Sequence, residues 1–377
     1  MKFTINSGEL QRALTAVGGA VPSKSTMPIL ECVLFERAGD SLRLLASDLD
    51  ISMSLQVPVP FESNGAGGRD RVAVPARRLL DTLRALSDVP VTFTSDADFG
   101  VELTTDQGRY KMVGFDGADF PALPSLDDAR ALETTGATIR RAVGQTSFAV
   151  SRDALRPAMM GVYFQLAPEG GRVVATDGHR LVRLSLTSLA ADPNLEFVVP
   201  EKALSLAAKA APEDGPCTLR VGSGYAEFDY GDVRVLGRLI DEPYPNYEAV
   251  IPQDNDRMLT ISREAMLRAV RRVALYSSTM THQVRLSLNE GQVVISAEDI
   301  ERNSEARETV MCEYDAEPME IGFNAVYLAE VLENARAEDV VFALSTPNRA
   351  GVVRPAEHPD GEEVLMLIMP VMLNAYA

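Results

Sequence analysis

Residues 173–182 read Val173-Val174-Ala175-Thr176-Asp177-Gly178-His179-Arg180-Leu181-Val182. The apolar residues on both sides and the central Asp-Gly pair predict a β-strand, a tight turn and a returning strand. Within this turn Asp177 has two possible roles. Its carboxylate can accept hydrogen bonds from its own backbone while Gly178 supplies a positive φ, or it can form an acid–base pair with His179. The spacing favours the first role and leaves the second open.

The same stretch has counterparts elsewhere, which indicates an internal repeat. An apolar strand that ends at an acidic turn occurs at 44–48, 173–177 and 295–299. A short strand followed by apolar residues at helical spacing occurs at 3–17, 148–155 and 259–266. A helix with an N-terminal Pro or Asn signal starts in the runs 74–77, 199–202 and 322–325. The three sets follow one another in the same order in each third of the chain, which makes a chance match of short apolar patterns unlikely.

This order predicts an α+β protein made of three repeats, each with two helices packed on antiparallel sheet. Short alternating runs fill the gaps, at 91–94, 218–221 and 340–344. Segments rich in Asp and Pro, 116–128 and 241–256, separate the repeats, since proline stops helices and holds the backbone extended. We therefore expect domains at 1–124, 130–252 and 256–377.

Composition limits the class of protein. The chain has 377 residues, of which 46% are hydrophobic, so it can form two or three domains with cores of their own. No signal peptide or membrane-spanning apolar run is evident. The three cysteines, Cys32, Cys217 and Cys312, are odd in number and far apart, which fits neither a disulfide framework nor a zinc site. We expect buried, reduced thiols in a cytoplasmic protein without a metal.

The charge is unevenly placed along the sequence. The whole chain carries a formal charge of −18, which normally argues against a nucleic-acid partner. Yet six expected helical windows (9–19, 76–86, 152–160, 201–210, 263–275 and 325–336) together hold 13 basic and 7 acidic residues. Such helices can face a polyanion while the acidic remainder repels it from other surfaces. Helix propensity explains part of the bias, because Arg and Lys favour helices and Asp favours turns.

The sequence resembles a known family, the bacterial sliding clamp or β subunit of the replicative DNA polymerase. The resemblance covers essentially the whole chain and rests on the runs 1–4 (Met-Lys-Phe-Thr), 27–30 (Met-Pro-Ile-Leu), 74–77 (Val-Pro-Ala-Arg), 118–121 (Ala-Asp-Phe-Pro), 175–181, 244–247 (Tyr-Pro-Asn-Tyr), 319–324 (Met-Glu-Ile-Gly-Phe-Asn) and 369–370 (Met-Pro). It implies a head-to-tail dimer that closes into a six-domain ring with helices lining the hole. DNA would be held topologically, through weak, sequence-independent phosphate contacts.

The resemblance also implies a peptide-binding groove, with the Asp-Gly turn at 176–181 as one wall. Methionines and rigid prolines would suit a socket shared by several partners. The matching positions are Met159, Thr176, Gly178, His179, Arg180, Leu181, Pro245, Val250, Tyr327, Met369, Pro370, Val371 and Met372. Two departures bear on peptide preference: Glu248 and Ala249 stand where the family is often basic, and residues 374–377 run past the usual end and could fold near the groove.

For DNA, the implied candidates are Lys24, Arg77, Arg152, Arg156 and Lys202. In the loop after the second domain's first helix, Pro157-Ala158 replaces the tyrosines of many clamps. For the seam of the dimer, the matching positions are Tyr110 and Met112 on one side, and Leu275 and Tyr276 on the other. Core packing is the alternative interpretation of these four, and the sequence supports it nearly as well.

The implied function is a non-catalytic, cytoplasmic, nucleoid-associated processivity factor that needs no cofactor or metal. Its implied partners are duplex DNA, a second copy of the chain, and short linear peptides of the polymerase catalytic subunit, clamp loader, repair polymerases, mismatch-repair proteins and ligase; no membrane is involved. Two alternatives remain open. One is a hydrolase that uses Asp177 and His179, although the chain has no Gly-x-Ser-x-Gly elbow, Walker loop or His-x-x-x-His pair. The other is a repeat scaffold that binds only proteins.

Overall fold

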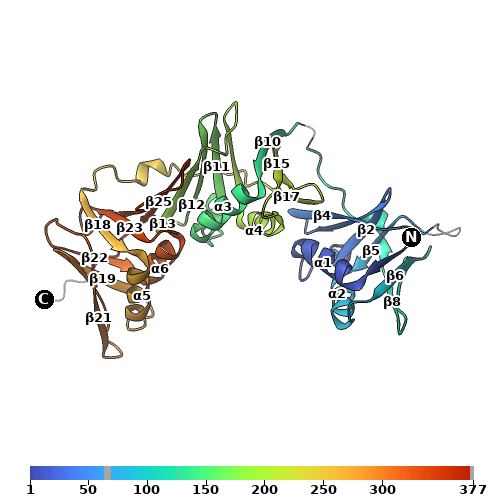
Figure 1. Cartoon of the computed structure of the whole chain (residues 1–377), viewed down its shortest axis with the longest axis horizontal. Helices are drawn as coiled ribbons and strands as arrows, with labels where there is room; N and C mark the ends of the chain where they lie inside the picture. Colours follow the sequence, from blue (N-terminus) through green and yellow to red (C-terminus); the bar gives the residue numbers. More distant parts are fainter. Residues whose placement is uncertain (63–68, 127, 374–377) are drawn as a thin grey trace. The chain divides into compact units, whose positions relative to one another are not determined.

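The computed structural model describes residues 1–62, 69–126 and 128–373 (Figure 1). One order of elements occurs three times: a strand, a helix, four strands, a second helix and three strands. The copies run from β1 to β8, from β10 to β17 and from β18 to β25, with the short strand β9 (Phe115–Asp116) after the first. The predicted α+β fold of three repeats is therefore confirmed.

The chain forms two compact units: unit 1 is Met1–Arg140 with Lys202–Leu239, and unit 2 is Arg141–Glu201 with Ile240–Ala377. Unit 1 contains a four-stranded sheet in the order β1 (Lys2–Asn6), β6 (Pro90–Ser95), β7 (Gly100–Thr104), β8 (Arg109–Val113). Its second sheet has the order β10 (Arg130–Thr135), β15 (Pro216–Val221), β16 (Tyr225–Asp229), β17 (Val233–Arg238), β4 (Ile51–Pro58), β3 (Ser41–Ser47), β2 (Cys32–Ala38), β5 (Arg71–Pro75), β9. In this sheet, strands of the first and second repeats pair antiparallel, with Ile51 opposite Gly237.

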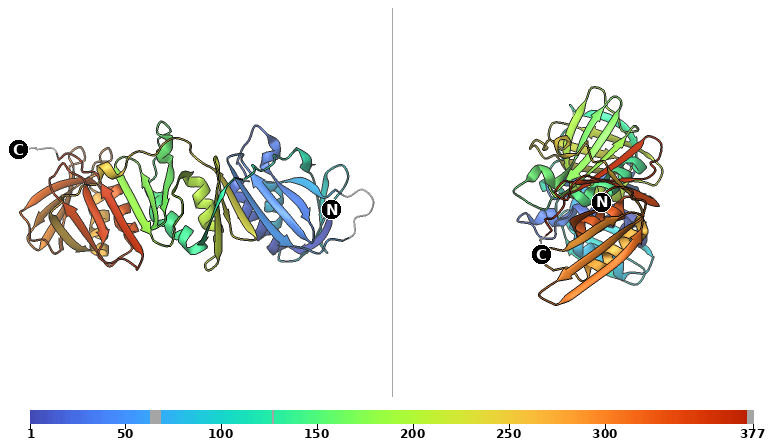
Figure 2. Two further views of the ribbon diagram at one scale, coloured as in Figure 1. Left: turned by 90° about the horizontal axis from the view of Figure 1, so that it is seen from above. Right: turned by 90° about the vertical axis from the view of Figure 1, so that its left-hand side faces the viewer.

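Unit 2 is built in the same way. Its larger sheet has the order β14 (Leu195–Pro200), β11 (Gly161–Ala167), β12 (Gly170–Thr176), β13 (Arg180–Leu186), β25 (Glu362–Ile368), β24 (Gly351–Pro355), β23 (Asp339–Leu344), β18 (Arg257–Ser262). The smaller one has the order β21 (Ser304–Met311), β20 (Gln292–Asp299), β19 (Gln283–Asn289), β22 (Met319–Asn324). Figure 2 shows these sheets from two further directions. Pairing of β13 with β25 joins the second and third repeats, with Arg180 opposite Ile368.

The helices cover the sheets with their apolar faces. They are α1 (Ser7–Val17), α2 (Ala76–Ala85), α3 (Gly136–Thr146), α4 (Glu201–Ala210), α5 (Arg263–Ala274) and α6 (Ala325–Asn334). In α1, Leu10, Leu14 and Val17 are buried at helical spacing. Asn324 caps α6, because its Oδ1 accepts a hydrogen bond from the backbone N–H of Val326 at 2.9 Å. Helices α1 and α2 pack against each other in unit 1, as α5 and α6 do in unit 2.

One predicted helix is wrong. The structure has no α-helix at 152–160: residues 151–156 form a loop, and Pro157–Met160 form a single 3₁₀ turn. The first helix of the second repeat is α3, so the corresponding helices begin at Ser7, Gly136 and Arg263. Sequence reasoning missed α3 because it starts with glycine, contains Gly144 and carries β-branched residues, all weak helix formers.

The three cysteines are free thiols. Cys32 and Cys217 are buried and Cys312 is half-buried; burial raises the pKa of the Cys32 and Cys217 thiols to about 12. No helix in the described ranges has the length and apolar character needed to cross a membrane. The expectation for the tail at 374–377 falls outside the described residues.

Candidate functional site

The candidate site lies in unit 2 and begins with the turn between β12 and β13. Asp177 Oδ1 accepts hydrogen bonds from the backbone N–H groups of His179 and Arg180, both at 2.9 Å. Thr176 Oγ1 accepts from Gly178 N at 3.1 Å and donates to the Arg180 carbonyl at 2.7 Å. Gly178 has φ +87°, in the left-handed region that favours glycine. Asp177 is therefore a turn cap, as its spacing predicted.

The acid–base pair of the hydrolase alternative is not formed. The second carboxylate oxygen of Asp177 lies 3.3 Å from Arg180 Nε, so the side chain is shared between backbone and guanidinium. The imidazole of His179 stacks on the ring of Tyr327, with 5.8 Å between centroids and 17° between planes. Within the described residues, no hydrogen bond joins the Asp177 and His179 side chains.

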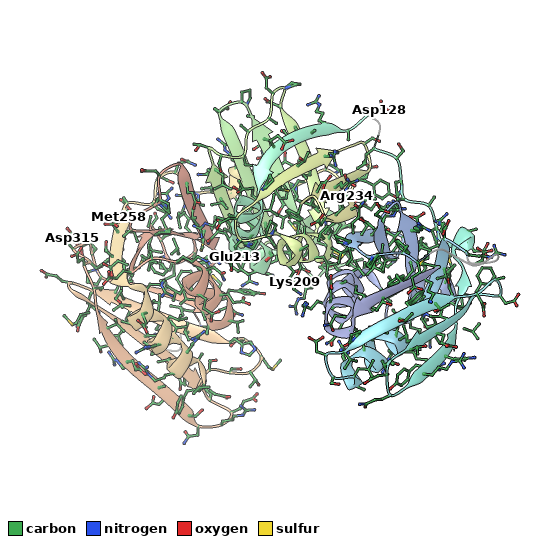
Figure 3. The ribbon with its side chains drawn as sticks, turned by 45° about the vertical axis from the view of Figure 1, so that its right-hand side comes forward. Asp128, Lys209, Glu213, Arg234, Met258 and Asp315 are labelled. Carbon is green, nitrogen blue, oxygen red and sulfur yellow. The ribbon has the colours of Figure 1, made fainter. Side chains whose placement is uncertain are left out.

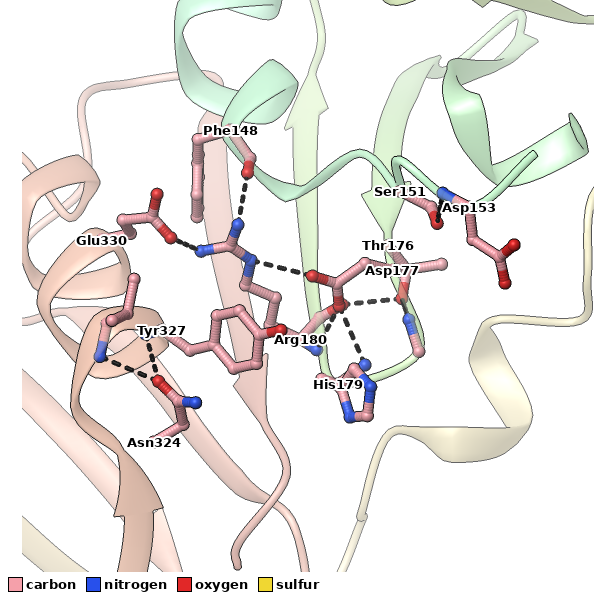
Figure 4. A network of polar contacts seen from close by, with 12 residues as sticks. Phe148, Ser151, Asp153, Thr176, Asp177, His179, Arg180, Asn324, Tyr327 and Glu330 are labelled. Atoms are coloured by element: carbon pink, nitrogen blue, oxygen red, sulfur yellow. Dashed lines mark hydrogen bonds and ion pairs between the residues drawn. The ribbon is translucent and has the colours of Figure 1, made fainter. Parts of the chain in front are cut away.

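Arg180 fixes the turn to the third repeat (Figure 4). Its side chain is buried, with 7% of the residue exposed, and forms ion pairs with Asp177 and with Glu330 of α6. Nη2 donates to the Phe148 carbonyl at 2.7 Å. The guanidinium lies 4.7 Å from the Tyr327 ring centroid and 5.3 Å from that of Phe148. A buried cation needs ion pairs, a carbonyl acceptor and aromatic faces of this kind to offset its desolvation.

The second wall of the site is the segment 244–254. Tyr244 stacks on Tyr163 of β11 at 4.8 Å between centroids, and Tyr247 donates its hydroxyl to Gln165 Oε1 at 3.0 Å. Burial raises the pKa of the Tyr244 and Tyr163 hydroxyls. Next to them, the Glu248 carboxylate pairs with Arg172 of β12 while both remain about half exposed. Aromatic stacking and an exposed ion pair thus hold this segment on the sheet.

Between these walls lies a cavity of about 570 Å³, a volume typical of ligand sites. Its floor comes from β25 and the residue after it, whose backbone N–H donates to the His179 carbonyl at 2.8 Å. Eight of the thirteen predicted groove residues line it: Met159, Thr176, Gly178, Arg180, Leu181, Pro245, Val250 and Met369. The lining is mainly apolar, so the cavity suits a ligand that inserts apolar side chains.

Three family models match consecutive parts of the chain. They describe the N-terminal, central and C-terminal domains of the DNA polymerase III beta subunit, and they match residues 1–124, 133–246 and 248–371. Together these matches cover nearly the whole sequence. The chain belongs to the DNA polymerase III beta subunit family.

Named relatives of this beta subunit agree with that assignment. The beta sliding clamp of Synechococcus elongatus is 30% identical over 383 residues, covering 100% of both chains. The crystal structure of the sliding clamp from Pseudomonas aeruginosa bound to griselimycin superposes with a TM-score of 0.92 at 28% identity, covering 99% of this chain and 100% of that one. The griselimycin-bound clamp of Bartonella birtlesii gives 0.91 at 27%, with the same coverage. The beta subunit is a sliding clamp and not an enzyme, which removes the hydrolase alternative.

Five predicted groove residues of the beta subunit do not line the cavity: His179, Tyr327, Pro370, Val371 and Met372. Two of them contact each other, since His179 stacks on Tyr327, and Tyr327 also packs on the Arg180 guanidinium. Val371 pairs with Gly322 of β22 as an isolated bridge. Sequence reasoning missed lining residues from the linker, from the β23–β24 loop and from β25: Asn246, Tyr247, Ala249, Ile251, Pro252, Gln253, Asp254, Asn348, Arg349, Ala350 and Leu367. The Tyr-Pro-Asn-Tyr run signalled the first of these, whereas nothing local marks Asn348-Arg349-Ala350.

The candidate DNA residues of the beta subunit differ in their surroundings. Within the described ranges, Lys24, Arg77 and Arg152 are exposed and have no acidic partner. Lys202 instead pairs with Asp48 at 2.5 Å, and Arg156 with Asp153 at 3.0 Å. Arg156 and Arg152 lie in the 151–156 loop and not on a helix, which corrects their predicted placement.

The four candidate residues of the dimer seam differ in their exposure to solvent. Leu275 is 81% exposed and Tyr276 is exposed as well, directly after α5. On the other side, Tyr110 is half-buried, and Met112 is only 6% exposed, because it faces the core of its own sheet. Strand β8, which carries both, is the last strand of its sheet, as β21 is in unit 2.

Proposed function

We propose that this beta subunit works as a head-to-tail dimer that closes into a ring around duplex DNA and binds partner proteins at the groove. The domains of the ring would be 1–124, 130–252 and 256–377. The groove carries the proposal: a preformed apolar cavity with two fixed walls suits short linear peptides of the polymerase, clamp loader and repair proteins. Griselimycin bound to two similar clamps supports a ligand-binding role for the fold. Such a protein would act in the cytoplasm, at the nucleoid.

The free sheet edges support the head-to-tail seam. Strand β8 presents exposed Arg109 and Lys111, and strand β21 presents exposed Glu305 and Arg307 beside the Glu308 carboxylate. Exposed apolar side chains accompany both edges, at Val113 (73%) and Met311 (73%). An unpaired edge strand is a template for pairing with another chain. Pairing β8 of one protomer with β21 of the next would satisfy both edges and close the ring.

Two measurements test this proposal. For encirclement, the loaded protein is followed on a closed circular duplex and again after a single cut: we expect retention on the circle and release after linearisation. Equal release from both forms would contradict topological holding and favour the scaffold that binds only proteins. For the groove, calorimetric titration with griselimycin compares wild type with Val250→Asp, a change that places a charge on an exposed part of the cavity lining. Unchanged binding by the variant would contradict the groove assignment, provided its melting temperature matches that of wild type.

A further inference from the structure

The cations on the two helix pairs differ in their partners. Helix α5 carries four arginines, and all are engaged. Arg263 Nε donates to the Ala337 carbonyl at 2.7 Å. The other three form ion pairs with glutamates: Arg268 with Glu264, Arg271 with Glu333 of α6, and Arg272 with Glu308 of β21.

The helices of unit 1 are different. Within the described residues, four helix cations have neither an acidic nor a carbonyl partner, and all four belong to unit 1: Arg12 of α1, Arg77 and Arg78 of α2, and Lys209 of α4. All are exposed; Figure 3 labels Lys209. Their neighbours on these helices are engaged, Arg84 with Asp81 at 3.5 Å and Lys202 with Asp48.

This difference decides how strongly each helix pair attracts a polyanion. A phosphate that approaches a paired arginine must compete with a carboxylate, and the displaced carboxylate then repels it. At physiological salt the Debye length is about 8 Å, so only such local charges act on a bound phosphate. Counterion release, which drives phosphate binding, therefore favours the unpaired cations.

We propose that the first repeat's helix pair α1–α2, assisted by Lys209, carries most of the electrostatic hold on duplex DNA, and that α5, whose four arginines are all engaged, contributes less. This adds Arg12, Arg78 and Lys209 to the phosphate-binding residues, and it rests on the proposed DNA-encircling function. The ligand is the phosphate backbone, independent of base sequence. A ring that holds DNA mainly through the helices of one repeat has few phosphate interactions to break as it slides.

The test is the salt dependence of affinity for a blunt fluorescent duplex, measured by anisotropy from about 50 to about 200 mM KCl. The logarithm of the affinity decreases linearly with the logarithm of the salt concentration. In R12Q/R78Q we expect the magnitude of this negative slope to decrease by about 0.9 for each phosphate that the variant no longer neutralises. R12K/R78K keeps the charge and should keep the slope. The matched control E264Q/R268Q removes a helix arginine together with its carboxylate, and its slope should equal that of wild type. E264Q/E333Q frees Arg268 and Arg271 and should steepen the slope.

The outcomes separate this inference from the proposed function. A control slope that falls as much as that of R12Q/R78Q, or a slope unchanged in R12Q/R78Q, overturns the assignment to α1–α2. Wild type that is not retained on a closed circle overturns the encircling function itself. Retention of R12Q/R78Q on the circle with a reduced slope supports both, because topology holds the ring and the α1–α2 cations supply the attraction. Dimer mass and melting temperature, matched to wild type, show that each variant is folded.

Discussion

The two walls of the groove are fixed to unit 2 by different physics. The turn at 176–181 is held by one buried cation, Arg180, whose carboxylate, carbonyl and aromatic partners all lie within the protein. The segment at 244–254 is held by the buried side chains of Tyr247 and Ile251, by tyrosine stacking and by the exposed pair of Arg172 with Glu248. Removing one partner of a buried ion pair leaves an uncompensated charge, whereas removing an exposed one lets water take its place.

The comparison teaches which wall is rigid. A wall fixed by a buried charge has one low-energy position, since any displacement exposes the guanidinium to an apolar surrounding. A wall fixed by apolar packing, stacking and a solvated ion pair can shift without leaving a buried charge uncompensated. We therefore expect the turn to be the constant side of the socket and the linker to be the side that adapts to different peptides.

Loss of the buried cation should have the largest effect. Arg180→Ala leaves the Asp177 carboxylate, whose side chain is 13% exposed, without its guanidinium partner, and we expect a loss of about 3 kcal/mol in the free energy of unfolding of unit 2. Calorimetric melting measures it, and hydrogen exchange at 176–181 shows whether the turn itself opens. The control is Glu333→Ala, because Glu333 lies on α6 like Glu330 but forms an exposed ion pair with Arg271. This variant should change the free energy of unfolding by less than about 1 kcal/mol. Equal effects of the two variants would contradict the contrast between the walls.

Loss of the aromatic stack should come second. Tyr244→Ala removes a half-buried ring from Tyr163 and should cost about 2 kcal/mol. Tyr244→Phe keeps the ring and loses only a long hydrogen bond, 3.5 Å from the hydroxyl to the Val174 carbonyl, so it should be nearly neutral. Urea unfolding compares the two. A phenylalanine variant as unstable as the alanine one would mean that the hydroxyl, and not the ring, anchors the segment.

The same tyrosine predicts a pH dependence. Burial raises the pKa of the Tyr244 hydroxyl above its ordinary value of 10.0, so the folded protein keeps its proton at a pH where the unfolded chain loses it. The contribution of this group is therefore fully present below pH 10 and is lost as the pH rises above it, by about 1.4 kcal/mol per pH unit. Melting temperatures of wild type and Tyr244→Phe between pH 9 and pH 11 should differ in slope. Parallel curves would contradict this linkage.

The three repeats could be predicted from the sequence because short local patterns of residues mark their strands, turns and helices. Strand, turn and helix signals recur in a fixed order, and the role of Asp177 follows from the Asp-Gly pair alone. The first helix of the second repeat was predicted at the wrong position. The strand-like run at 148–150 precedes Arg152 and Asp153 in the way that a strand precedes a helix in the other repeats. The true helix, α3, begins with glycine and gives no start signal.

The long-range contacts that fix the two groove walls to the rest of unit 2 could not be predicted from the sequence. Arg180 and Glu330 are 150 residues apart, and no local feature pairs them. Tyr163 and Tyr244 meet only because the linker packs on the sheet that contains β11. The same holds for the charges, since a count of helix arginines does not show which of them face a carboxylate.

Loss of the exposed pair should have the smallest effect and the strongest dependence on salt. Glu248→Gln and Arg172→Gln should each change the free energy of unfolding by less than about 1 kcal/mol, because both side chains are about half exposed. A double-mutant cycle isolates their coupling, which should shrink when NaCl is raised to about 1 M, where the Debye length falls to about 3 Å. Griselimycin affinity, measured in parallel, should change little. A coupling above about 2 kcal/mol that persists in high salt would make the linker as rigid as the turn, and the distinction between a fixed and an adaptable wall would fail.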